Sequence, residues 1–466
     1  MKSTTNVESR LAAAQMHALA AVRREIRSRD SASRRKYLRE FAQSFRNYDR
    51  VLSTEEFDRC IGSASIILIG DYHSLAAAQQ FAANLLEQAA PHAPIVLGVE
   101  AVLSRDQHIL DFWWRREIDE SELRQRLRFD REWGYDWQSF YELLIAAREH
   151  GEAVYGLDCM PRDDLRSIRS RDRHAAAKIG EMRQRHPHAK VVVLFGESHM
   201  APQHLPALLH ESLQGERILT VLQNLDSIYW RAVSDEAAAV SIADDTICVF
   251  NSSPLEKYES YRLCLEKWNA AADEPPDFAP AVYNLIRSLA RTLGFRLDSP
   301  HNGTQLKFLA DSLPEVISIE QDAEELFAAT TLATEFAGLG PMRRRLEQVR
   351  SELVSRLEEQ GCVYVPAANR FLIREFHVNH VAAEAARFLR RACVGDAGPE
   401  SRDEKTTADA LAYFGSRLLC PSANDNALHP VGESLYQGYI EGRLTNAAVR
   451  RIFLAKGERT EACGSL

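Results

Sequence analysis

The segment from Ser65 to Asn251 alternates short apolar runs with helical stretches, and this alternation constrains the fold more than any other feature of the chain. The apolar runs are rich in β-branched residues and are apolar at successive positions. Such runs suit strands buried on both faces of a mainly parallel sheet. Strand–helix alternation predicts βαβ units in a layered α/β domain. The expected strands are Ser65–Gly70, Pro94–Val99, Ala153–Leu157, Val191–Phe195, Ile218–Leu222 and Thr246–Phe250.

The remainder of the chain is predicted to be helical. Residues 1–50 are charged and alanine-rich, and they form the expected N-terminal helical extension. Strand patterns nearly stop after residue 252, so the predicted division is an α/β domain over 51–252 and an α-helical region over 253–466. The helices expected in that last region are Leu255–Trp268, Ala279–Leu293, Gln321–Phe336, Met342–Glu359, Val378–Ala392, Thr406–Leu419 and Leu444–Lys456.

Composition narrows the class of protein. The net charge of −9 argues against a general nucleic-acid binder, which normally carries a basic face. The eight cysteines include no CxxC pair, so neither a zinc ribbon nor a disulfide scaffold is expected. No uncharged apolar stretch reaches about 18 residues, and the N-terminus has no signal-peptide core, so we expect no membrane span and a cytoplasmic location. The sequence leaves open whether the chain forms a homo-oligomer.

Polar residues follow four of the expected strands at the point where each strand ends. The first strand runs into Gly70-Asp71-Tyr72-His73, and the fourth into Gly196-Glu197-Ser198-His199. Glu100 ends the second strand and Asp158 the third. Because the carboxyl ends of parallel strands share one edge, where ligands bind, we expect these side chains to meet in one site.

Two kinds of chemistry suit this combination of residues. A histidine paired with an aspartate or glutamate can perform general acid–base catalysis near neutral pH. Imidazoles and carboxylates also bind divalent metals, and the candidate ligands are Asp71, His73, Glu197 and His199. A further pair, Arg171 and Asp172, lies in the helix expected before the fourth strand. Arg171 could hold a carboxylate or an oxyanion, Asp172 could orient a histidine, and an exposed charged helix turn is the alternative.

Two other patterns carry less weight. The aromatic residues between Trp113 and Tyr141 are dense, and helical core packing explains most of them, with a wall of a ligand pocket as the alternative. His377 and His380 form an HxxH pair without an acidic third ligand, which favours an incidental pairing over a metal or haem site.

The first half of the chain resembles the ChaN-like family, described as haem-binding uptake proteins, of the superfamily that includes Tiki, TraB and erythromycin esterase-like proteins. The resemblance covers roughly Ile66 to Pro206. It lies in the order and spacing of the segments IGDYHSLAAAQQ, VLGVEAVLSRDQHILDFW, REWGYDWQSFYELL, VYGLDCMPR, RSRDRHAAAKI and VVVLFGESHM. Asp71 stands where the family typically has glutamate, Glu197 stands where many relatives have a small or amide residue, and no lipobox is present.

Three functions are considered, and the resemblance implies the first two. Esterase- and Tiki-like members imply a hydrolase acting on an ester, lactone or peptide bond, with or without a divalent metal, at the residues His73, Glu100, Arg171, Asp172 and His199. ChaN-like members imply a haem-binding protein, with Tyr72 or a histidine as the iron ligand. The third hypothesis is a non-catalytic scaffold that binds a partner through its helical half. The substrate of the first hypothesis would be a small molecule or a peptide.

Overall fold

The computed structural model describes residues 2–30, 36–162, 168–269, 276–295, 313–319, 340–394, 402–421 and 428–455. The chain groups into two compact units, one made of Arg27–Cys264 and the other of Met1–Ile26 together with Leu265–Leu466. The unit boundary falls inside helix α12 (Pro254–Asn269), and α1 (Lys2–Arg29) also spans a boundary. The division at residues 50 and 252 stays a prediction.

The unit Arg27–Cys264 is built on one eight-stranded sheet with strand order β1-β7-β8-β6-β2-β5-β3-β4. All pairings from β8 to β4 are parallel, while β7 is antiparallel to both β1 and β8. The prediction of a mainly parallel α/β sheet is therefore confirmed. The strands are β1 (Arg50–Val51), β2 (Ile66–Asp71), β3 (Ile95–Leu103), β4 (Gly151–Asp158), β5 (Lys190–Gly196), β6 (Ile218–Gln223), β7 (Ala239–Ala243) and β8 (Thr246–Val249).

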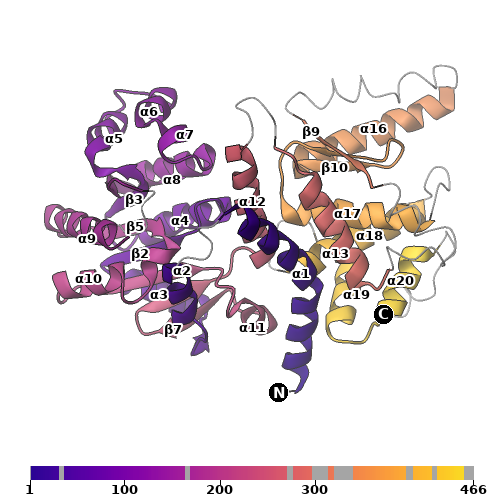
Figure 1. Cartoon of the computed structure of the whole chain (residues 1–466), viewed down its shortest axis with the longest axis horizontal. Coiled ribbons are helices and arrows are strands. Elements are labelled where there is room, and N and C mark those ends of the chain that lie inside the picture. The colour runs from indigo at the N-terminus through magenta and orange to yellow at the C-terminus, as the bar shows by residue number, and fades with distance from the viewer. Residues whose placement is uncertain are drawn as a thin grey trace. The chain divides into compact units, whose positions relative to one another are not determined.

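Helices cover both faces of this sheet, which explains the continuous apolar runs. Successive side chains of a strand point to opposite faces, so each central strand supplies two separate cores. Ile67, Leu97 and Val192 pack with α4 (Ala76–Ala89) and α8 (Trp137–His150). Ile66, Val96 and Val191 pack on the other face with α9 (Ile168–Arg185) and α10 (Leu205–Ser212). Figure 1 shows these helices around the sheet.

The remaining helices of this unit add side chains to the same two cores. Asp119 begins α6 with its carboxylate accepting the Glu122 N–H, and Asp136 begins α8 by accepting the Ser139 N–H, as N-cap residues do. The other elements are α2 (Lys36–Ser44), α3 (Thr54–Ser63), α5 (Gln107–Trp114), α6 (Glu120–Leu127), α7 (Phe129–Glu132), α11 (Tyr229–Ser234) and the 3₁₀ turns η2 (Ser104–Asp106) and η4 (Glu197–Met200).

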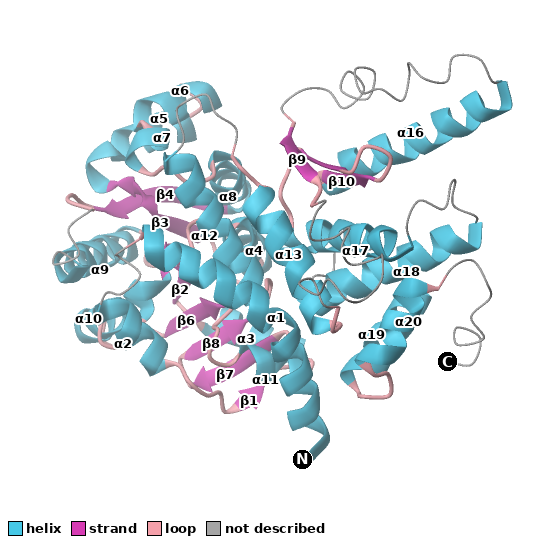
Figure 2. Cartoon of the chain, turned by 45° about the vertical axis from the view of Figure 1, so that its right-hand side comes forward, coloured by secondary structure: helices cyan, strands magenta, loops and turns pink. Residues whose placement is uncertain are grey.

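The second unit is mostly helical and also contains a small sheet, visible beside α16 in Figure 2. In this sheet β10 (Cys362–Val365) is antiparallel to β11 (Arg370–Ile373), which is parallel to β9 (Glu315–Ser318). Its described helices are α13 (Ala279–Thr292), α16 (Gly340–Gln360), α17 (Val378–Val394), α18 (Arg402–Leu419), α19 (Pro430–Ile440) and α20 (Asn446–Leu454).

Two details of this unit differ from the sequence prediction. The strands β9 to β11 were not expected, because each has only four residues and none shows a period that stands out from the flanking helices. Helix α19 was not among the expected helices. It begins at His429, whose side chain accepts the Gly432 N–H, and it has proline at its first position, which suits a helix start. The expected helix Gln321–Phe336 lies outside the described residues. No described helix has both the length and the apolarity needed to cross a membrane.

Candidate functional site

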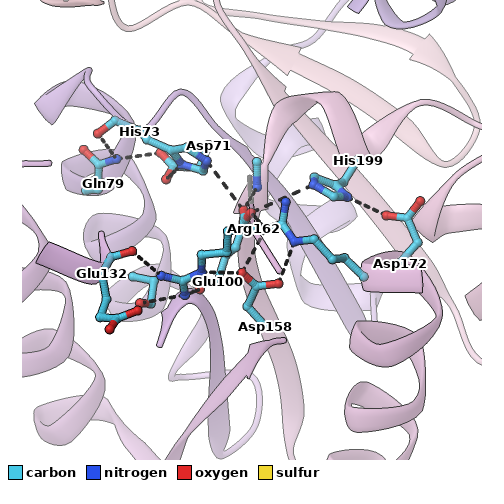
Figure 3. A network of polar contacts seen from close by, with 12 residues as sticks. Asp71, His73, Gln79, Glu100, Glu132, Asp158, Arg162, Asp172 and His199 are labelled. Carbon is cyan, nitrogen blue, oxygen red and sulfur yellow. Dashed lines mark hydrogen bonds and ion pairs between the residues drawn. The ribbon is translucent and has the colours of Figure 1, made fainter. Parts of the chain in front are cut away.

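The candidate site lies at the carboxyl ends of four adjacent strands, β2, β5, β3 and β4. Parallel pairing sets Asp71 beside Gly196, and Val99 beside Leu194, so the residues that follow each strand emerge at one edge. The predicted residues Asp71, His73, Glu100, Arg171, Asp172 and His199 form one connected polar network, drawn in Figure 3.

Glu100 is the centre of the network. It is 4% exposed, its Oε2 accepts the backbone N–H of Gly196 at 2.5 Å, and its Oε1 accepts a hydrogen bond from Arg171. Burial alone would raise the pKa of Glu100, but His73, Arg171 and His199 together lower it to about 2. This carboxylate is therefore ionised at neutral pH.

A side chain at position 196 would crowd the central carboxylate and the ring of His73. A Cβ at this position would lie 3.1 Å from Oε2 of Glu100 and 3.2 Å from Nε2 of His73. The glycine of the second Gly-acid-x-His motif thus allows a backbone N–H to approach the central carboxylate.

Two histidines flank Glu100, and each is held by its own aspartate. His73 Nε2 lies 3.7 Å from Glu100 Oε2, while His73 Nδ1 lies 2.8 Å from Asp71 Oδ2. His199 Nε2 lies 3.9 Å from Glu100 Oε1, while His199 Nδ1 lies 2.5 Å from Asp172 Oδ1. An imidazole that donates through Nδ1 keeps its Nε2 available for proton transfer.

The two histidines differ in exposure. The side chain of His73 is 22% exposed, whereas that of His199 is 4% exposed. The ring of His73 packs against Trp133, with centroids 4.5 Å apart, and against Tyr135 at 5.2 Å. Burial acts to lower the pKa of His73, but the charges of Glu100 and Asp71 outweigh it and raise that pKa above the usual value. The ring of His73 is therefore more accessible to solvent than that of His199.

Two arginines fix the carboxylates of this edge. Arg171 donates from Nε to Asp158 Oδ1 at 2.8 Å and from Nη2 to Asp158 Oδ2 at 2.9 Å, in addition to its bond with Glu100. Arg162 donates to Asp158 Oδ2 at 2.7 Å and to the Glu100 carbonyl at 2.8 Å, and it lies over the ring of Trp133. Burial acts to lower the pKa of Arg171, but Glu100 and Asp158 raise it, so its charge is permanent.

Glu197 and Tyr72 face helix α12 and not the central carboxylate. Glu197 Oε2 accepts a hydrogen bond from Lys257 at 2.8 Å, and the Lys257 ammonium lies 4.6 Å from the centroid of the Tyr72 ring. Burial raises the pKa of Glu197 despite the neighbouring Lys257, and burial likewise raises the pKa of Tyr72 well above its usual value.

Four residues of this region were missed by the sequence prediction. Gln79 donates to Asp71 at 2.6 Å, Arg162 joins two strand ends, His204 contacts Asp172 at 3.1 Å, and Lys257 pairs with Glu197. Arg162 was within reach of prediction, because it follows Asp158 by four residues in the third strand-end segment. The other three lie on helices or turns where no sequence pattern marks them as part of the site.

A cavity of about 10 Å³ adjoins this network, which is room for about one water molecule. Its polar lining comes from Asp71, His73, Gln79, Glu100 and Asp136, and the rest comes from Val99, Ala101, Trp133, Phe140 and Leu194. Among the residues that the structure describes, no group of three or more His, Cys, Asp or Glu side chains is arranged to hold a metal ion.

Comparisons with known proteins agree with the resemblance seen in the motifs. The family model described as "Haem-binding uptake, Tiki superfamily, ChaN" matches residues 59–189, which include Asp71, His73, Glu100, Arg171 and Asp172 but not His199. No curated protein matches the chain.

Two solved structures are similar to part of the chain. One is described as "Cofacial heme binding to ChaN of Campylobacter jejuni". It is 15% identical in sequence with a TM-score of 0.28, and the match covers 37% of this chain and 86% of that one. "The structure of the type III effector HopBA1" is 14% identical, with a TM-score of 0.33, over 44% of this chain and 96% of that one. Residues 59–189 of this chain therefore match the ChaN-like family of the Tiki superfamily.

Proposed function

We propose that this site is the active site of a hydrolase that activates one water molecule, with His73 as the general base. One observation carries the proposal: His73, held at Nδ1 by the buried Asp71, lines a cavity with room for about one water. The substrate class is an ester, a lactone or a peptide.

The proposed reaction uses the imidazole of His73 twice. In its neutral form the ring donates Nδ1–H to Asp71, and its Nε2 takes a proton from the water as the water oxygen bonds to the substrate carbonyl carbon. The bond from that carbon to the leaving oxygen or nitrogen then breaks, and the leaving atom receives the proton from Nε2. The ionised Glu100, 3.7 Å from Nε2, stabilises the imidazolium formed between the two steps.

The other residues support Glu100 in this scheme. Arg171 is bonded to Asp158 and Glu100, so its charge keeps Glu100 ionised and is not directed at the substrate. His199 lies on the opposite side of Glu100, and Asp172 fixes its ring. We therefore propose that Arg171, Asp172 and His199 orient the Glu100 carboxylate and keep it ionised.

The residues expected to ligate a divalent metal fit that role poorly. Asp71 is bonded to His73 Nδ1 and to Gln79, and Glu197 is paired with Lys257. The guanidinium of Arg171 lies on Glu100, and a cation next to it would be repelled. No step of the proposed reaction is therefore routed through a metal.

Haem also fits this site poorly. The Tyr72 ring is packed against the Lys257 ammonium, and burial raises the pKa of Tyr72, which favours the neutral phenol over the phenolate that binds iron. Tyr72 of this chain is therefore poorly suited to ligate the iron of haem.

The experiment is a hydrolysis screen with esters, lactones and peptides, run with and without EDTA. We expect turnover that EDTA does not change and that His73→Gln reduces about 100-fold or more. The matched control is His108→Gln, at an exposed histidine on α5, which should retain full activity. Absence of turnover across the panel, or equal activity of His73→Gln and the parent protein, would refute the proposal. Haemin titration provides a separate test, in which saturable binding lost in Tyr72→Phe would restore the haem hypothesis.

A further inference from the structure

His204 lies outside the pair of Gly-acid-x-His motifs, yet it contacts the network that they build. It occupies the N-cap position of α10, five residues after His199. Its Nδ1 lies 3.1 Å from Asp172 Oδ2, while Asp172 Oδ1 lies 2.5 Å from His199 Nδ1. His204, Asp172 and His199 are all at least nine-tenths buried. One carboxylate therefore bridges two imidazoles in the interior.

The state of Asp172 indicates which atoms carry the protons. Burial alone would raise the pKa of Asp172, but the hydrogen bonds from His199 and His204 lower it, so the carboxylate is ionised and only accepts. Both histidines must then donate through Nδ1. For His199 this leaves Nε2 directed at Glu100, 3.9 Å away.

We propose that His204 is a positioning residue that fixes the Asp172 carboxylate through Oδ2, so that Oδ1 holds His199 in the Nδ1–H tautomer. A carboxylate with only one hydrogen-bonded oxygen can turn about its Cβ–Cγ bond, whereas two donors on separate oxygens fix its plane. The effect on catalysis rests on the proposed hydrolase function, while the effect on the tautomer does not.

The surroundings of the other ring nitrogen of His204 indicate that this residue does more than stabilise the fold. Its Nε2 is buried and has no hydrogen-bond partner within the described ranges, and Oε2 of Glu40 lies 4.0 Å away. A buried polar atom without a partner costs about 1–3 kcal/mol, so Nε2 supplies no stabilisation that would explain a histidine at this position. The contact with Asp172 is the feature of His204 that an apolar residue lacks.

The experiment compares two substitutions in the full-length protein. In His204→Asn the side-chain amide can replace Nδ1 as the donor to Asp172, whereas His204→Leu removes the donor and keeps a similar volume. The primary measurement is the tautomer of His199, from the ¹⁵N shifts of its ring in histidine-labelled protein, with the resonances assigned by their loss in His199→Gln. The matched control is His210→Asn, at a half-exposed histidine in the same helix that faces Asp245.

We expect the parent protein, His204→Asn and His210→Asn to hold His199 with its proton on Nδ1. His204→Leu should show mixed tautomers and, on any substrate found, about a tenfold lower kcat at similar KM. Unchanged ¹⁵N shifts in a folded His204→Leu variant would overturn the proposal, as would equal damage from Asn and Leu. The tautomer of His199 is measured without substrate, so this experiment tests the role of His204 even in a protein that lacks hydrolase activity.

Discussion

Nε2 of His73 lies 3.7 Å from Oε2 of Glu100. The other oxygen of this carboxylate, Oε1, lies 3.9 Å from Nε2 of His199. Two imidazoles that are 126 positions apart in the chain (199 − 73 = 126) therefore share one buried negative charge. Each imidazole also has an aspartate on its far nitrogen, which orients it toward that charge. Four predictions test the consequences of this arrangement.

Asp71→Asn should reduce kcat/KM by about 100-fold or more, because an amide nitrogen next to His73 Nδ1 favours the tautomer whose Nε2 carries the proton and cannot act as a base. Steady-state kinetics on a substrate from the hydrolysis screen measure this effect. Asp245→Asn, at an exposed aspartate that faces His210, is the control and should behave as the parent protein. Full activity in Asp71→Asn would contradict the role of Asp71.

The rate should rise with pH through a pKa above 6.5, because His73 acts as a base only when neutral and its pKa is raised. Glu100→Gln removes the negative charge that raises the pKa of His73 most. The acid limb of the kcat/KM profile should therefore move to lower pH in Glu100→Gln, even where the maximal rate falls. A limb that stays in place, or moves to higher pH, would show that Glu100 does not act on His73.

Arg171→Met should destabilise the α/β unit by about 3–5 kcal/mol, because it removes the buried guanidinium that pairs with the carboxylates of both Glu100 and Asp158. Urea unfolding followed by tryptophan fluorescence reports on this unit, which contains five of the six tryptophans. Arg185→Met, on the same helix but largely exposed, should change stability by at most about 0.5 kcal/mol. Equal effects of the two substitutions would contradict this assignment.

Lys257→Met should destabilise the protein because it leaves the Glu197 carboxylate without its cation, and adding Glu197→Gln should recover most of the loss. Burial already raises the pKa of Glu197, and removing Lys257 raises it further. The folded state then binds more protons than the unfolded state, so the loss in Lys257→Met should shrink as pH falls below that raised pKa. A double-mutant cycle by urea unfolding at two pH values measures both effects, and a loss independent of pH would disagree with them.

Much of the architecture was predictable because a strand buried on both faces of a sheet is apolar at successive positions of the sequence. The runs at Ile66–Ile69 and Val191–Phe195 are apolar at every position, since their side chains enter two separate cores, and they were assigned as strands correctly. The strand Ala239–Ala243 was missed because its burial falls away toward its end, as expected for a strand near the edge of the sheet. The four-residue strand at Cys362–Val365 was missed because so short a run has no distinctive period.

The site divides in a similar way between what is local and what is not. The sequence alone placed Asp71, His73, Glu100 and His199 at or near the carboxyl ends of strands, since strand ends are encoded by neighbouring residues. In the structure Asp71 ends β2 and Glu100 lies inside β3, which continues to Leu103. Only the tertiary structure decided the partners of these residues. Arg171 bonds to carboxylates 13 and 71 positions away in the chain. Glu197, expected as a metal ligand, pairs instead with Lys257. Asp172 contacts both His199 and His204. Such pairings depend on which helix covers which strand end, and no periodicity in the sequence records that choice.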